Sequence, residues 1–338
     1  MKRVVVCGAG GFIGGHLTAE LLHQGHSVRC VDVKPFDEWY LHFDKAENLC
    51  LDLRLREACD QATGGVDLVY NLAADMGGMG FIENHKAACM LSVLINTHLL
   101  LAARDNSAER YFFSSSACVY AAEKQKSPAV LPLREEDAYP AMPEDGYGWE
   151  KLFSERMCRH FREDFGLETR VARYHNVYGP FGTWQGGREK APAAICRKVI
   201  EARDTGSGEI EIWSDGKQTR SFMYIDDCLA GIDRIMHCDP LVATPINLGS
   251  SELVSINRLV ELVEAVAGVK LERRYQLDAP RGVAGRNSDN TFIKQVLGWE
   301  PSFPLAQGLE RTYRWIEQQY RDRKAGGGSP LLRQRTVS

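Results

Sequence analysis

The sequence predicts an α/β fold, with a doubly wound parallel sheet followed by a smaller C-terminal α/β domain. Three observations support this prediction. A strand-like run at residues 4–7 leads directly into a glycine-rich turn and a helix that ends near residue 24. Short apolar runs then alternate with helical patterns, as they do in parallel sheets. The chain has 338 residues, 44% hydrophobic and 25% charged, which suits one large domain and a smaller one.

Each predicted element follows from its local pattern. Besides the first run, four apolar runs are predicted to be buried strands: residues 28–32, 66–72, 110–114 and 169–174. Helical periodicity covers residues 85–105 and 147–165. Residues 177–191 are rich in glycine, proline and aromatic side chains, so we expect a long ordered loop that lines a site.

The order of elements predicts two discontinuous domains. Residues 1–174 plus 221–246 are expected to form the large domain. Residues 175–220 plus 247–322 are expected to form the smaller one. The stretch 325–338 contains Gly-Gly-Gly-Ser and is expected to be a disordered tail.

Composition narrows the classes of function. The net charge of -4 argues against a nucleic-acid-binding surface. We see no apolar run near the roughly 20 residues that span a bilayer, so no membrane partner is expected. The ten cysteines form no CxxC or Cys/His cluster with zinc spacing, so no metal is expected. Free thiols in this number indicate a reducing, cytoplasmic location.

A glycine-rich turn follows the first strand and opens a helix, with glycines at Gly8, Gly11 and Gly14. Such glycines allow close approach of a pyrophosphate, and the helix N-terminus supplies free N–H groups to that anion. The acid Asp32 ends the second strand, where a carboxylate holds the ribose 2′-OH and favours NAD over NADP. The larger domain is therefore predicted to be a Rossmann-like NAD-binding domain. The alternative is a glycine-rich turn without a ligand.

Tyr147 and Lys151 are four residues apart on the predicted helix 147–165 and share one face. An ordinary tyrosine titrates near ~10, too high for a base at neutral pH. A neighbouring ammonium and a positive nicotinamide ring would stabilise the phenolate. Tyr147 could then take a proton from a sugar hydroxyl while hydride leaves the same carbon. The spacing is common by chance, and it gains weight from occurring together with the glycine turn.

Several segments resemble the GDP-mannose 3,5-epimerase family, which belongs to the extended short-chain dehydrogenases/reductases. The spacing Gly8-x-x-Gly11-x-x-Gly14 resembles the wider group, as does the stretch DGKQTRSF at residues 215–222. The more specific segments are AADMGGMGF at 73–81, HNVYGPFGTWQGGREKAP at 175–192 and GRNSDN at 285–290. The resemblance covers residues 1–320. Ala121 and Ala284 depart from the family pattern, the second of them near the expected substrate pocket.

The resemblance implies NAD as cofactor, GDP-mannose as substrate and a homodimer. The implied products are GDP-L-galactose and, by inversion at carbon 5 alone, GDP-L-gulose. The implied catalytic residues are Tyr147, Lys151, Ser116, Cys118 and Lys190. The implied cofactor-binding residues are Gly8, Gly11, Phe12, Ile13, Gly14, Asp32, Asp52, Leu72, Ala73, Ala74, Tyr147 and Lys151. The implied substrate-binding residues are Gly80, Ser116, Ala117, Cys118, Asn176, Glu189, Lys190, Ala191, Lys198, Gln218, Arg220 and Arg286.

The chemistry explains why such an enzyme needs these groups. Oxidation of carbon 4 to a ketone makes the hydrogens on carbons 3 and 5 acidic, and inversion then needs an acid and a base on opposite faces. The resemblance assigns these two roles to Cys118 and Lys190. The substrate pyrophosphate needs cations, and the candidates are Arg188, Lys190, Lys198, Arg220 and Arg286. A buried structural thiol is the alternative for Cys118.

Three other functions remain open at this point. A nucleotide-sugar 4,6-dehydratase usually carries Asp-Glu after the serine or threonine of this strand, where this chain has Ala117-Cys118. Another nucleotide-sugar epimerase would share most of the same groups. A non-catalytic NAD-binding sensor would not need Tyr147, Lys151, Cys118 and Lys190 together.

Overall fold

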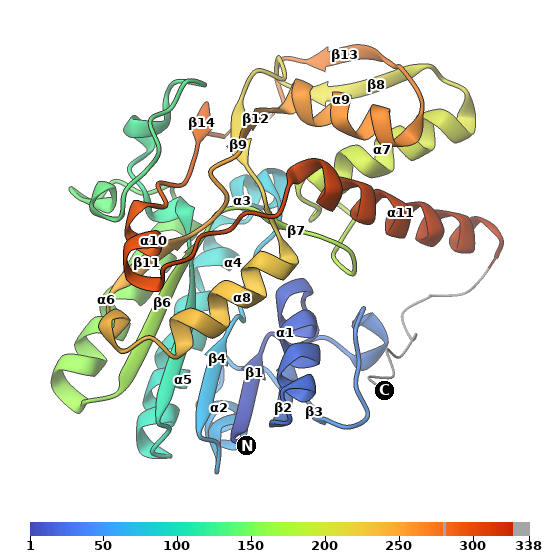
Figure 1. Cartoon of the computed structure of the whole chain (residues 1–338). Helices are drawn as coiled ribbons and strands as arrows, with labels where there is room; N and C mark the ends of the chain where they lie inside the picture. The colour runs from blue at the N-terminus through green and yellow to red at the C-terminus, as the bar shows by residue number, and fades with distance from the viewer. Residues whose placement is uncertain (280–281, 327–338) are drawn as a thin grey trace.

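The computed structural model describes residues 1–279 and 282–326, and its centre is a seven-stranded parallel sheet with helices on both faces (Figure 1). The strand order is β11-β6-β5-β4-β1-β2-β3, and every neighbouring pair in it is parallel. The strands are β1 Arg3–Cys7, β2 Ser27–Asp32, β3 Glu47–Cys50, β4 Leu68–Asn71, β5 Arg110–Ser116, β6 Glu168–Tyr174 and β11 Pro245–Leu248. The predicted doubly wound, Rossmann-like sheet is confirmed.

Alternation along β1 shows why helices cover both faces of the sheet. Val4 and Val6 pack into the apolar cluster on one face, while Val5 and Cys7 pack into the cluster on the other. Because successive side chains of a strand point to opposite faces, a continuous apolar run needs cover on both sides. The first face carries α1 Phe12–His23 and α8 Ile225–Met236, and the second carries α2 Arg56–Thr63, α5 Ser92–Asp105 and α6 Tyr147–Phe165.

The long helical stretch predicted at residues 85–105 is two helices, α4 Lys86–Met90 and α5. They meet at Leu91, whose carbonyl accepts from the Leu94 amide only three residues on, so the turn tightens there. A short helix, α3 Met79–Asn84, precedes them. The prediction of helix at 147–165 is confirmed with the same bounds.

A smaller unit lies beyond the carboxyl edge of the large sheet and appears at the top of Figure 1. Its helices α7, α9 and α11 pack against one another. They are α7 Ala191–Thr205, α9 Ile256–Ala267 and α11 Leu305–Lys324. The strands here are β8 Glu209–Trp213, β13 Glu272–Gln276, β9 Thr219–Ser221, β12 Leu253–Ser255 and β14 Gly285–Arg286, which form the sheets β13-β8 and β12-β9-β14.

The remaining elements are short. They are β7 Val177–Tyr178 paired with β10 Met223–Tyr224, the helix α10 Thr291–Leu297, and single 3₁₀ turns at Phe36–Glu38, Ala117–Val119, Ala122–Gln125, Glu135–Ala138 and Asp239–Leu241. The strand β11 spans the predicted domain boundary between residues 246 and 247. Of the tail predicted at 325–338, residues 327–338 lie outside the described part of the chain.

One helical stretch is more apolar than the sequence analysis expected. Within the described residues, the helical segment Lys86–Asp105 is long and apolar enough to cross a membrane by length and composition, and 39% of its apolar 18-residue window is buried inside the structure. It comprises α4 and α5, which pack on α6 and α2. A helix packed into the body of a domain meets the same two criteria.

Candidate active site

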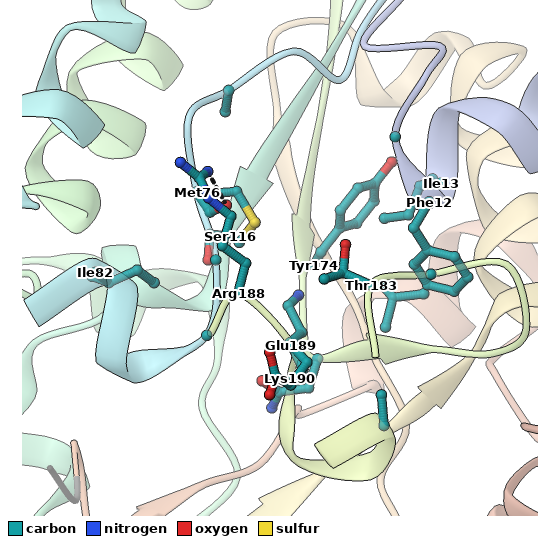
Figure 2. Close-up of a pocket in the computed structure, with 18 of the residues that line it drawn as sticks. Phe12, Ile13, Met76, Ile82, Ser116, Tyr174, Thr183, Arg188, Glu189 and Lys190 are labelled. Atoms are coloured by element: carbon teal, nitrogen blue, oxygen red, sulfur yellow. Dashed lines mark hydrogen bonds between the residues drawn. The ribbon is translucent and has the colours of Figure 1, made fainter. Parts of the chain in front are cut away.

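One cleft of about 1170 Å³ opens at the carboxyl ends of β1, β2, β4 and β5, where parallel α/β sheets bind ligands. The sheet supplies one wall and the smaller unit supplies the other. Every residue that the sequence analysis assigned to catalysis, cofactor or substrate lines this cleft. In Figure 2, Glu189 and Lys190 lie in the middle, with Met76 and Ser116 toward one side and Phe12, Ile13 and Thr183 toward the other.

The glycine turn forms a cradle, a space beside its backbone that a side chain at these glycines would occupy. Gly8 has a φ of +87°, and a Cβ on it would lie 2.9 Å from the Ala73 amide nitrogen. A Cβ on Gly14 would lie 2.1 Å from the Gly8 carbonyl oxygen. Among the described residues, no side chain caps the N-terminus of α1, and the first turn of this helix contains no acid. The free amides at this helix start therefore face the cleft and fit a pyrophosphate.

Two carboxylates lie beside this cradle. Asp32 is buried at the end of β2, and its Oδ1 accepts from the Lys34 amide at 3.1 Å. Asp52 pairs with Arg54 at 2.7 Å, and the hydrogen bonds from Arg54 lower the pKa of Asp52. Asp32 is thus placed to accept from a ribose hydroxyl, and the cradle together with Asp32 fits NAD.

The Tyr147 and Lys151 side chains are both buried at the start of α6. The Lys151 ammonium lies 3.6 Å from Glu150 Oε2 and 5.6 Å from the centre of the Tyr147 ring. Burial raises the pKa of the Tyr147 phenol well above its usual value, and Cys118 and Glu150 add to this, while the hydrogen bond with Ser116 opposes it. The protein alone therefore holds Tyr147 protonated. The further positive charge that the sequence analysis invoked would have to come from the nicotinamide.

Cys118 stands on a 3₁₀ turn directly after β5. The Ser116 hydroxyl accepts from the Cys118 amide at 3.2 Å and caps this turn. A Cβ on Gly148 would lie 2.4 Å from the Cys118 carbonyl oxygen, so only glycine lets the start of α6 approach this closely. The Arg286 guanidinium donates from Nη1 to Cys118 Sγ at 3.5 Å. Cys118 is therefore fixed in place and faces the cleft beside a cation.

Lys190 reaches the same cleft from the smaller unit, as the N-cap residue of α7. In the described part of the chain, its ammonium has no hydrogen bond or ion pair. Burial lowers the pKa of Lys190, and the nearby Cys118 opposes that shift. A lowered pKa brings an amine closer to exchanging protons at neutral pH. The structure thus brings two proton-transfer groups, Cys118 and Lys190, to one space from different elements.

The two most distinctive sequence segments pack on each other. The Gly78 amide donates to the Arg188 carbonyl at 3.0 Å, and a Cβ on Gly78 would lie 2.5 Å from the Glu189 carbonyl oxygen. The Arg188 side chain donates to Asp75 at 2.7 Å and stacks 3.8 Å from the Phe81 ring centre. Arg188 therefore links the loop that carries it to the segment 73–81 (Figure 2). Its charge is paired with Asp75, so it is not a free cation for a pyrophosphate.

The other predicted substrate residues are held by neighbours. Lys198 pairs with Glu211 at 3.1 Å, and Glu189 accepts from Arg197 and from the Gly187 amide. The remaining contacts are Asn176 Nδ2 to the Ser221 carbonyl, Arg220 to the Thr219 and Val283 carbonyls, and Gln218 Nε2 to the Trp213 carbonyl. In the part of the chain that the structure describes, Gln218 Oε1 is buried without a hydrogen-bond partner, so a ligand donor would satisfy it.

A buried polar network holds the end of β5, directly before Cys118. Arg173 on β6 pairs with Glu155 on α6 at 2.7 Å, and both side chains are 2% exposed. The Ser115 hydroxyl donates to the same carboxylate at 2.5 Å. A buried ion pair is tolerated when further hydrogen bonds satisfy its atoms, as they do here. The network fixes the end of β5, from which Ser116 and Cys118 project.

Sequence reasoning missed three residues of the site, Asp75, Gln125 and Glu144. Asp75 binds Arg188, while Gln125 and Glu144 bind Arg286. Their partners lie more than 100 residues away along the chain, and the segment 73–81, which contains Asp75, does not itself reveal the pairing with Arg188.

The sequence matches one protein family and is similar to several characterised proteins. Residues 4–249 match the sequence profile of the NAD dependent epimerase/dehydratase family. The chain is 46% identical over 331 residues to the GDP-mannose 3,5-epimerase of Arabidopsis thaliana, covering 98% of this chain and 86% of that protein. The GDP-mannose 3,5-epimerase 1 of Oryza sativa subsp. japonica is also 46% identical, over 96% of this chain and 84% of its own length.

Solved structures support the same fold. The UDP-glucose 4-epimerase of Thermotoga maritima, solved with UDP-glucose, aligns with a TM-score of 0.83 at 24% identity. The alignment covers 94% of this chain and 99% of that one.

Proposed function

The chain belongs to the NAD-dependent epimerase/dehydratase family, and from that premise we propose that it is a GDP-mannose 3,5-epimerase. It would invert carbons 3 and 5 of the hexose through a transient 4-keto sugar and yield GDP-L-galactose. Inversion at carbon 5 alone would yield GDP-L-gulose. The observation that carries the proposal is the convergence of Tyr147, Cys118 and Lys190 on one cleft beside the glycine cradle.

The redox half of the reaction falls to the large domain. NAD, when bound, accepts the hydride from carbon 4 and returns it. Tyr147 would take the proton of the carbon 4 hydroxyl, with Ser116 hydrogen-bonded to its phenol. Lys151, buried one turn along α6, would hold the nicotinamide ribose.

The inversion half falls to Cys118 and Lys190. They come from opposite sides of the cleft, one after β5 and one at the start of α7. One group would remove the proton from carbon 3 or carbon 5 of the ketone, and the other would return a proton to the opposite face. Each well-placed acid or base contributes roughly 10²–10⁴ in rate. Arg220, buried in the smaller unit's wall, would meet the substrate pyrophosphate, while the Arg286 guanidinium contacts Cys118, Gln125 and Glu144.

The cofactor is expected to stay bound through turnover, because the hydride leaves and returns within one catalytic cycle. Denaturing the purified protein should release NAD(H), and NADP should not replace it, since Asp32 repels a 2′-phosphate. Chromatography of the released nucleotide measures this. Full activity in protein stripped of all nicotinamide would contradict the proposal.

A turnover assay with GDP-mannose separates the candidate functions. The proposed function predicts GDP-hexose products with inverted carbons 3 and 5. A 4,6-dehydratase would give a 4-keto-6-deoxy sugar, and a non-catalytic binder would return GDP-mannose unchanged.

We further propose that the enzyme is a cytoplasmic homodimer. Exposed apolar side chains gather on neighbouring helices: Met90, Leu91 and Leu94 on the α4–α5 stretch, and Trp149 and Phe153 on α6. Their exposed fractions run from 38% to 51%, and a second copy would cover them. All ten cysteines are free, which suits a reducing compartment, and fractionation of cells tests the location.

The dimer is tested by sedimentation velocity. The parent protein should sediment as a dimer, and Phe153→Glu should shift it toward the monomer because a charge would be buried in the interface. A parent that sediments as a monomer at micromolar concentration, or that binds lipid vesicles through this face, would contradict the dimer.

A further inference from the structure

The environment of Cys118 contains a cation held in three directions. Arg286 is buried on β14, and each nitrogen of its guanidinium has a different partner. Nη1 donates to Cys118 Sγ at 3.5 Å, and Nε donates to Gln125 Oε1 at 2.7 Å. Nη2 pairs with the Glu144 carboxylate, and the exposed fractions of these two side chains are 6% and 12%. The guanidinium is thus held against the sulfur.

Gln125 and Glu144 are themselves tied to the chain around Cys118. Gln125 is fully buried, and its side-chain Nε2 donates to the Tyr120 carbonyl at 3.2 Å. The backbone carbonyl of Gln125 accepts from the Ala284 amide. The Glu144 amide donates to the Cys118 carbonyl at 3.1 Å. Both residues therefore link the segment after β5 to the strand that carries Arg286, across the two walls of the cleft.

We propose that Gln125 and Glu144 hold Arg286 against Cys118, and that the net charge of this cluster sets how readily the Cys118 thiol ionises. A thiolate is the form that can accept a proton from carbon, and a guanidinium in contact with sulfur favours it. Glu144 opposes that effect, since a carboxylate near the sulfur disfavours the anion. The proposal rests on the proposed function only in giving the thiolate a catalytic purpose.

Several other titratable groups face Cys118. They are Lys190 from the start of α7, Tyr147 from α6 and Cys89 from α4. Lys190 favours the thiolate and the other two do not. The proposal is therefore best tested by isosteric changes at Gln125 and Glu144, which leave these three groups in place.

The experiment measures alkylation of Cys118 by iodoacetamide as a function of pH, with peptides resolved by mass spectrometry. Glu144→Gln removes a negative charge and should lower the midpoint of the profile by about one pH unit. Gln125→Glu adds one and should raise it by about the same amount. At a pH below the parent midpoint, Glu144→Gln should thus react roughly tenfold faster than the parent. Arg286→Met should raise the midpoint.

The exposed Cys50 in the same molecule is the internal reference, and its profile should not move in any variant. Thermal unfolding confirms that each variant is folded. Unchanged Cys118 midpoints in folded Glu144→Gln and Gln125→Glu would overturn the proposal, as would shifts in the same direction. Alkylation needs no turnover, so the test stands apart from the proposed function. Opposite shifts in a protein that does not convert GDP-mannose would refute the function and leave the positioning role intact.

Discussion

Tyr147→Phe is expected to abolish conversion of GDP-mannose, with a rate loss near 10⁴-fold, at the upper end of what one acid or base contributes. In the proposed mechanism the phenol takes the hydroxyl proton at carbon 4, and both inversions depend on the ketone. The variant keeps the ring that packs against Cys118, Phe81 and Ile82. Chromatography of the GDP-sugars measures the rate.

The matched control for this variant is its cofactor content, which should stay near that of the parent. Lys151→Ala should differ by losing both bound NAD and rate, because in the proposed mechanism the Lys151 ammonium, which lines the cleft, holds the nicotinamide ribose. If Tyr147→Phe epimerises at nearly the parental rate, oxidation does not come first and the mechanism is wrong.

Cys118→Ala and Lys190→Ala are expected to separate oxidation from inversion. Each should keep NAD and the fold, and transient oxidation at carbon 4 should continue. Inversion should fall by about 10²–10⁴-fold, because one of the two proton-transfer groups is missing. In D₂O the variants should lose most of the deuterium uptake into the sugar, which mass spectrometry and NMR of the product measure.

Cys118→Ser distinguishes a catalytic thiol from a packing residue. A serine hydroxyl is close to a thiol in shape but is a far poorer base, so this variant should be nearly as defective as Cys118→Ala. Parental epimerisation and deuterium uptake in Cys118→Ser would assign Cys118 to packing, and the base would then lie elsewhere in the loop 175–192.

The large domain could be read from sequence because its signals are local. The run Val4-Val5-Val6-Cys7 is apolar throughout, and α6 keeps its amphipathic period over 19 residues without a break. The strand β3 was not predicted, because Glu47–Cys50 has no apolar run and is a strand only through pairing with β2. The helix α2 was missed because it is short and polar, with a Cys59 that packs inward.

The sequence predicted which residues line the cleft, but it did not predict which of them contact one another. Motifs at the ends of β1, β2, β4 and β5 must meet at one edge of a parallel sheet, so Gly8, Asp32 and Cys118 share the cleft. The pairing of Arg188 with Asp75 depends on how two loops 113 residues apart pack. The contact of Arg286 with Cys118 spans 168 residues. Neither contact has a spacing or composition signal, and both needed the folded structure.

The central claim is that one cleft oxidises carbon 4 reversibly and inverts carbons 3 and 5. The most direct measurement is the position of deuterium in the GDP-hexose product after turnover of GDP-mannose by the parent enzyme in D₂O. The account predicts deuterium at carbons 3 and 5 and none at carbon 4, since the hydride returns from the cofactor rather than from solvent. Inverted product without deuterium at carbons 3 and 5, or with deuterium at carbon 4, would contradict it.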